Sequence, residues 1–98
     1  MAAYVVLHVT ITDPVAYADY EVPATRATID DAGGRILALD DSHVVVEGEI
    51  EEKRTVLLEF PDFEAAETWY HSAEYQRAVA IRSSASHGRM TLVHGWEG

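Results

Sequence analysis

The sequence has 98 residues, no cysteine and a formal net charge of −10, from 17 acidic and 7 basic side chains. This length predicts one domain, residues 1–98, with one small hydrophobic core. The negative charge, without a lysine–arginine cluster, argues against nucleic acid and anionic membranes as partners. No apolar run is long enough to span a membrane, and the first residues lack the pattern of a signal peptide, so we expect a cytoplasmic protein.

The first third of the chain predicts a strand, a helix and a second strand. Residues 5–11 (VVLHVTI) are apolar and β-branched, which is typical of a buried strand. Asp13-Pro14 should begin a helix, because Asp caps helices well and Pro is tolerated at the first helical position. Pro23 should kink this helix and Gly33-Gly34 should end it. Residues 35–39 (RILAL) predict the second strand.

The rest of the chain predicts two more strands around a second helical region. Turn residues at 40–42 precede residues 43–47 (HVVVE), which either resume the second strand or form a hairpin with it. Residues 54–60 (RTVLLEF) predict the third strand. Pro61-Asp62 should then begin a helix, Ser72 should cap a second helical segment, and Gly88 should separate that segment from a last strand at 90–94 (MTLVH).

This β-α-β-β-α-β order predicts an α+β fold, a ferredoxin-like sandwich in which one four-stranded antiparallel sheet carries the helices on one face. Both faces of the first strand are largely apolar, because Val5, Leu7, Val9 and Ile11 alternate with Tyr4, Val6, His8 and Thr10. Helices can cover only one of these faces. A second subunit is the simplest cover for the other, so we expect a homodimer.

Acid–base chemistry is the chemistry that the residue types favour. The five histidines show no HxxxH or HExxH spacing, so we expect no metal site. His8 lies mid-strand, where an imidazole is either a hydrogen-bonded core residue or lines a cavity. With Glu59 from another strand and the phenols of Tyr17 and Tyr20, His8 would form a usable acid–base set if the strand register brings them together.

The segment 68–82 (TWYHSAEYQRAVAIR) is dense in aromatic and charged side chains. We expect several of them to reach a cavity wall and contact a substrate, although aromatic residues at helical spacing are more often core. Arg82 shares a stripe with an aromatic and an aliphatic residue, so it either binds a carboxylate or covers apolar surface with its stem. The predicted substrate-binding residues are Tyr17, Trp69, Tyr70, Ser72, Tyr75, Arg82 and, at a turn edge, His43.

Several segments together resemble an uncharacterised family of small proteins in the dimeric α/β-barrel superfamily. They are TDPVAYADY (12–20), GGR (33–35), EG (47–48), RTVLLEFPDFEAAETWYHSAEYQ (54–76) and Arg82, and the fourth is the most specific. The resemblance implies ferredoxin-like subunits whose sheets pack face to face in a homodimer. It also implies a cavity between sheet and helices, which the wider superfamily uses for cofactor-free oxygenation, polyketide cyclisation, lactone isomerisation and dehydration. Two residues depart from the family pattern, His71 in place of an acid and Ala73 in place of proline.

These observations predict a small enzyme without an organic cofactor that isomerises, cyclises or dehydrates an aromatic or polyketide-like carbonyl compound. His8 would move protons, Tyr20 would donate to an enolate oxygen, and Glu59 would orient the substrate or act as base. Arg82 would hold a carboxylate or phenolate. A homodimer that binds a small ligand without catalysis and a cofactor-free monooxygenase are the alternatives.

Overall fold

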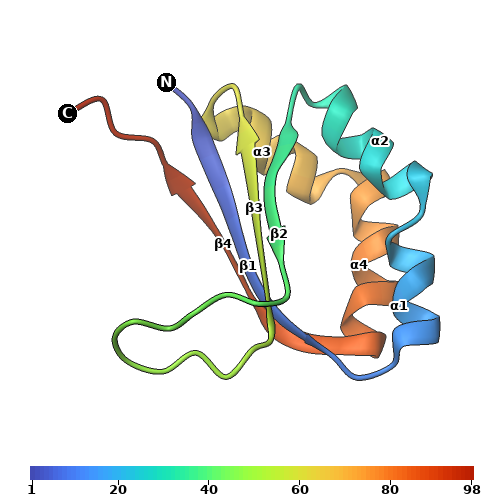
Figure 1. The fold of residues 1–98 in the computed structure, drawn as a ribbon. Coiled ribbons are helices and arrows are strands. Elements are labelled where there is room, and N and C mark those ends of the chain that lie inside the picture. Colours follow the sequence, from blue (N-terminus) through green and yellow to red (C-terminus); the bar gives the residue numbers. More distant parts are fainter.

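The computed structural model describes residues 1–98 and contains one antiparallel sheet with helices on one face (Figure 1). The strand order is β2-β3-β1-β4. The strands are β1 (Ala3–Ile11), β2 (Arg35–Asp40), β3 (Arg54–Phe60) and β4 (Ser86–His94). The helices are α1 (Pro14–Tyr20), α2 (Pro23–Asp31), α3 (Phe63–His71) and α4 (Ala73–Ala85). The predicted ferredoxin-like α+β fold is confirmed, with each predicted helical region present as two helices.

The central strand β1 sets the orientation of the sheet. Its odd-numbered residues from Ala3 to Val9 are buried against the helices, and its even-numbered residues point to the opposite face. β1 pairs with β3 on one side and β4 on the other, so residues opposite one another share a face. Gly88 of β4 lies so close to β1 that a Cβ atom there would be 2.1 Å from the carbonyl oxygen of His8.

Aromatic side chains fill the core between the sheet and the helices. Phe60, Trp69 and Tyr75 are almost fully buried, and the ring centroids of Trp69 and Tyr75 are 3.9 Å apart. The Trp69 indole donates a hydrogen bond of 3.0 Å to the Thr28 hydroxyl, which satisfies its polar atom and joins α3 to α2.

Polar side chains begin three of the helices as the sequence predicts. The Asp13 carboxylate accepts from the Ala16 amide, and the Asp62 carboxylate accepts from the Ala65 amide. The Ser72 hydroxyl accepts from the Tyr75 amide and starts α4. At Pro23 the predicted kink is a complete break, because proline lacks the N–H that the preceding turn would need, and α2 starts there as a separate helix.

Two predictions about the strands are wrong, one about the segment 43–47 and one about the start of β4. Residues 43–47 form no strand and belong to an irregular loop over residues 41–53, where Val44 and Val46 are more than three-quarters exposed. The three consecutive valines at 44–46 therefore pair with no strand. β4 begins at Ser86 rather than at Met90, because Gly88 pairs with Val9 inside the strand instead of separating the strand from α4.

The second face of the sheet carries no helix (Figure 1). Loop 41–53 crosses one end of this face, where Glu52 reaches over β1 to Arg89 of β4 at 2.7 Å. Burial raises the pKa of the Glu52 carboxyl. Hydrogen bonds from its own backbone amide and from Arg89 lower that pKa by more, so the net effect is a pKa below the usual value. None of the helices is long and apolar enough to cross a membrane.

Candidate functional site

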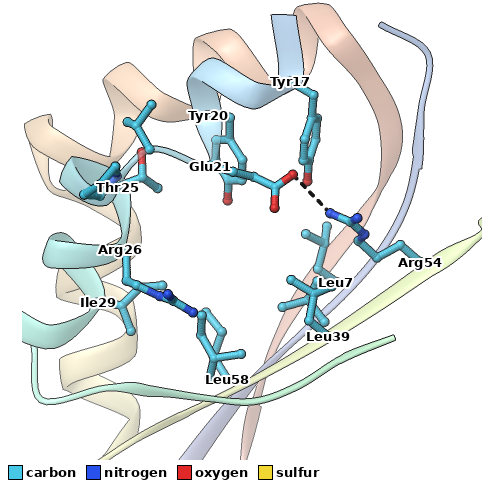
Figure 2. A pocket seen from close by; sticks show the side chains of 14 residues that line it. Leu7, Tyr17, Tyr20, Glu21, Thr25, Arg26, Ile29, Leu39, Arg54 and Leu58 are labelled. Atoms are coloured by element: carbon cyan, nitrogen blue, oxygen red, sulfur yellow. Dashed lines mark hydrogen bonds and ion pairs between the residues drawn. The ribbon is translucent and has the colours of Figure 1, made fainter. Parts of the chain in front are cut away.

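The candidate site is a cavity of about 290 Å³ between α1, α2 and the sheet (Figure 2). Its floor is aliphatic and comes from the helix-facing positions of β1, β2 and β3. Because α2 packs on α4 rather than down onto β2, this part of the sheet is left uncovered. Leu39 therefore remains 47% exposed although it faces the helices. The floor residues are Leu7, Ile36, Leu39, Val56 and Leu58.

The break between α1 and α2 forms part of the cavity wall. Glu21 and Val22 occupy the junction that Pro23 imposes, and all three residues line the cavity. Thr25, Arg26 and Ile29 continue the wall along α2. The proline that ends α1 thus places an irregular, partly polar segment over an aliphatic floor.

Two phenols from α1, those of Tyr17 and Tyr20, line the cavity. In Figure 2 both side chains descend from α1 toward the cavity, with their hydroxyl groups at the lower end. The hydroxyl oxygens of Tyr20 and the fully buried Tyr75 are 2.7 Å apart and share a hydrogen bond. When Tyr75 is the donor in this pair, the Tyr20 proton remains available to a ligand.

All three phenols are held in their protonated form at neutral pH. Burial, with the neighbouring Tyr20 and Glu21, raises the pKa of Tyr17 to about 12 against the opposing effect of Arg54 and Arg82. Burial and Tyr75 raise the pKa of Tyr20 still further, and burial raises that of Tyr75. In this cavity the tyrosines are therefore hydrogen-bond donors and not bases.

Arg82 lies beside the tyrosine pair without a carboxylate partner. Its guanidinium carbon is 5.8 Å from the centroid of the Tyr20 ring, and its buried Nε has no hydrogen-bond partner. The Glu59 carboxylate forms its ion pair elsewhere, at 2.8 Å from Arg35. The positive charge of Arg82 partly offsets the effect of burial on the pKa of Tyr20.

Charged side chains occupy one side of the cavity. Arg54 forms two hydrogen bonds with the Asp41 carboxylate, at 2.6 and 3.1 Å, and one with the Glu21 carboxylate at 3.2 Å. These two carboxylates raise the pKa of the Arg54 guanidinium. In return, the guanidinium lowers the pKa of the Asp41 carboxyl. Glu21 is the carboxylate that lines the cavity, and the ion pair with Arg54 holds it in place (Figure 2).

The structure does not bring His8 and Glu59 to the tyrosines. Both residues are on the face of the sheet opposite the cavity, since His8 pairs with Thr55 and Glu59 pairs with Tyr4. The Thr55 hydroxyl lies 3.2 Å from Nδ1 of His8 and 2.8 Å from Nδ1 of His43, so the two histidines meet through Thr55. No group of three His, Asp or Glu side chains is placed to hold a metal ion.

The remaining predicted residues are structural within one subunit. Trp69 is core, and half-buried Tyr70 lies against the rings of Trp69 and Tyr75 without reaching the cavity. Ser72 caps α4 and also donates to the Trp69 carbonyl oxygen at 2.7 Å. Each has the ordinary structural role that its residue type favours.

Three charged cavity residues, Glu21, Arg26 and Arg54, are absent from the sequence prediction. Glu21 follows the end of α1 and Arg26 lies in the first turn of α2, so their place in the cavity depends on the helix break at Pro23. Arg54 sits on the same face of β3 as Val56 and Leu58, so the alternation of that strand places it on the helix side.

Comparison with solved structures shows the same fold. A protein of unknown function from Rhodopseudomonas palustris, RPA0582, superposes with a TM-score of 0.77 at 17% identity, over 99% of this chain and 84% of that one. SnoaB, a cofactor-independent oxygenase from Streptomyces nogalater, gives 0.67 at 13% identity, over 99% and 95%. An antibiotic biosynthesis monooxygenase gives 0.55 at 17% identity, over 100% and 99%.

No curated protein matches the sequence. Residues 2–96, nearly the whole chain, match the family described as Domain of unknown function (DUF1330). This match and the shared fold agree with the resemblance seen in the sequence segments 12–20 and 54–76. The chain belongs to the DUF1330 family and has the subunit fold of the dimeric α/β-barrel, antibiotic biosynthesis monooxygenase-like proteins.

Proposed function

We propose that the cavity binds a small, mostly apolar carbonyl compound and that the protein catalyses a proton-transfer reaction on it without an organic cofactor. A volume of about 290 Å³ suits a compound of one or two fused rings. An aliphatic floor favours a flat apolar body, and the polar groups gathered on one side would orient its oxygen. Isomerisation, cyclisation and dehydration of such a compound share one early step, loss of a proton beside the carbonyl group.

The observation that carries this proposal is the Tyr20 hydroxyl, which reaches the cavity while hydrogen-bonded to Tyr75 at 2.7 Å. When Tyr75 donates to Tyr20, the Tyr20 proton is free to bind a carbonyl oxygen. That bond strengthens as the oxygen gains negative charge, so it stabilises the enolate more than the ketone. The raised pKa of Tyr20 keeps the proton in place at neutral pH.

Glu21 is the candidate base. It is the one carboxylate in the cavity lining, and its ion pair with Arg54 fixes it beside the tyrosines. We assign it the proton-abstracting role that the sequence suggested for His8 or Glu59, because within one subunit both of those residues face away from the cavity. Arg82, behind Tyr20, would favour a negative charge on the bound oxygen.

Cofactor-free oxygenation is the second candidate, supported by the cofactor-independent oxygenase SnoaB among the proteins of this fold. An enolate formed in the same cavity would react directly with dioxygen. A CH₂ group and one O₂ would then yield a C=O group and one water, which balances atoms and electrons. Uptake of one O₂ per substrate separates this reaction from isomerisation, cyclisation and dehydration, which consume none.

The experiment is a screen of aromatic ketones and naphthols, followed by absorbance, mass spectrometry and an oxygen electrode. Tyr20→Phe should lower turnover of any substrate found by about 100-fold, since it removes a donor to the developing oxyanion. Tyr70→Phe is the matched control, because Tyr70 packs on the same aromatic cluster without reaching the cavity. Full turnover in Tyr20→Phe would contradict the proposal. Binding without conversion of any compound would favour the ligand-binding alternative.

We further propose that the protein acts as a homodimer through the face of the sheet opposite the helices. Tyr4, Val6 and Leu57 lie half-buried on this face, and Val93 beside them is 39% exposed. A patch of this kind is costly in water, and a second copy presents a matching apolar surface. Such a dimer would enclose His8 and His43 between the two sheets.

A further inference from the structure

Arg26 is a cation in the cavity lining without a carboxylate partner. It projects from the first turn of α2, and Figure 2 shows its side chain reaching from α2 toward Leu58. The chain forms ion pairs at Arg35, Arg54 and Arg89, but none at Arg26. Arg26 is an exposed residue, so its guanidinium is open to a ligand that enters from solvent.

Arg54, the other arginine in the cavity lining, differs from Arg26 because it is paired with carboxylates. Arg54 is bound by both Asp41 and Glu21, so its charge is already balanced. Of the two arginines that line the cavity, Arg26 is therefore the one without a carboxylate partner. A planar guanidinium binds carboxylates through two parallel hydrogen bonds, which makes it well suited to an organic acid.

The two polar regions of the cavity lie on different sides of its aliphatic floor. Tyr17, Tyr20 and Glu21 gather beneath α1, whereas the Arg26 guanidinium lies on the α2 side near Leu58 (Figure 2). A ligand that uses both must carry a carbonyl or hydroxyl oxygen at one end and an anion at the other. The apolar body between them would lie over Leu7, Val56 and Leu58.

We propose that Arg26 is an anion-binding residue and that the substrate of this cavity is an organic carboxylate with an apolar, ring-bearing body. This inference rests on the proposed function, because it specifies the ligand of the same cavity. It adds a prediction that the proposed function does not make, namely discrimination between a carboxylate and its neutral amide. Arg26 acts in binding and takes no part in proton transfer.

The test compares naphthoate with naphthamide, two compounds of the same shape that differ in charge. Binding is followed by NMR chemical shifts of the Leu58 and Val56 methyl groups, which line the cavity floor. We expect wild-type protein to bind naphthoate about five- to tenfold more tightly than naphthamide, the moderate preference of a charge-assisted contact at a partly solvated site. Arg26→Gln should abolish that preference, because it weakens the binding of naphthoate far more than that of naphthamide.

Arg77→Gln is the matched control, since Arg77 is an exposed arginine of α4 that forms no ion pair and does not line this cavity. It should keep the full preference, which excludes an effect of net charge alone. Equal binding of acid and amide by wild-type protein, or an unchanged preference in Arg26→Gln, would overturn the inference while leaving the cavity as a ligand site. Failure of both compounds to shift the methyl signals would count against the proposed function itself.

Discussion

The hydroxyl oxygens of Tyr20 in α1 and Tyr75 in α4 lie 2.7 Å apart, although 55 residues separate them in the chain. This bond joins the wall of the cavity to the core, because Tyr75 is fully buried and Tyr20 reaches the cavity. It fixes the position of a phenol that would otherwise rotate freely about its side-chain bonds. The donor proposed for catalysis is thus held by the same contact that packs α1 on α4.

Removing one hydroxyl of this pair should destabilise the fold. Tyr75→Phe leaves the Tyr20 hydroxyl without its partner, and we expect a loss of about 1–2 kcal/mol in the free energy of unfolding. In the double variant Tyr20→Phe/Tyr75→Phe, the loss in the free energy of unfolding should be about 1 kcal/mol smaller than the sum of the losses in the two single variants. The reason is that the second substitution leaves no hydroxyl without its partner. Urea unfolding of the four proteins measures this coupling, and strict additivity would show that the bond contributes nothing.

The raised pKa of Tyr17 predicts a loss of stability at high pH. Above about pH 10 the unfolded phenol has lost its proton, while the folded one keeps it until about pH 12. The unfolded state then binds fewer protons than the folded state, so the free energy of unfolding falls as pH rises through this window. Below pH 10 this contribution is fully present.

Tyr17→Phe checks that assignment. The variant cannot ionise at this position, so its stability should fall less steeply than that of wild-type protein between about pH 10 and 12. Urea unfolding across this range gives both slopes. Identical slopes would mean that Tyr17 ionises equally easily in the folded and unfolded chains.

Gly88 should not tolerate a side chain. A Cβ atom at this position would lie 2.1 Å from the His8 carbonyl oxygen, and the pairing of β1 with β4 keeps the two strands from moving apart. We expect Gly88→Ala to cost about 3 kcal/mol or to prevent folding. Gly48→Ala is the comparison, since nothing surrounds Gly48 and only its positive φ of 76° is at stake, for about 1 kcal/mol. Similar melting temperatures for the two variants would refute this account.

A charge in the middle of the uncovered sheet face should prevent self-association. Val6 is half-buried on that face, and in the proposed dimer it would meet the second sheet. Val6→Lys should shift the protein from twice the chain mass to the chain mass in sedimentation equilibrium, because an unpaired ammonium is costly in an apolar interface. Val15→Lys, at an 84% exposed position of α1, should leave the mass unchanged. A monomeric wild-type protein would contradict the proposed dimer.

The order of the elements could be predicted from the sequence because its signals are local. Asp13-Pro14, Asp62 and Ser72 each begin a helix through their own side chains or ring. The strand predicted at residues 43–47 was wrong, because a segment with strand propensity becomes a strand only where a neighbouring strand is available to pair with it. No strand pairs with this loop.

The site was harder to predict because it depends on which sheet face the helices cover. Both faces of β1 are apolar, so His8 could not be assigned to the cavity or to the opposite side from its own strand. The packing of α1 and α2 decides this, and it places Tyr17 and Tyr20 in the cavity and His8 outside it. Glu21 and Arg26 were missed because their position follows from the break at Pro23, where sequence reasoning expected one kinked helix.

The bidentate contact between Asp41 and Arg54 has a consequence for engineering. It joins the two ends of the loop by a salt bridge, in a chain that has no cysteine. No side-chain hydrogen bond holds residues 44–51 within the loop, and Gly48 has open space around it. Lengthening a closed loop costs only about 0.6 kcal/mol for each doubling of its length. The turn at Gly48 is therefore a position where an epitope or a fluorescent peptide can be inserted without disturbing the sheet.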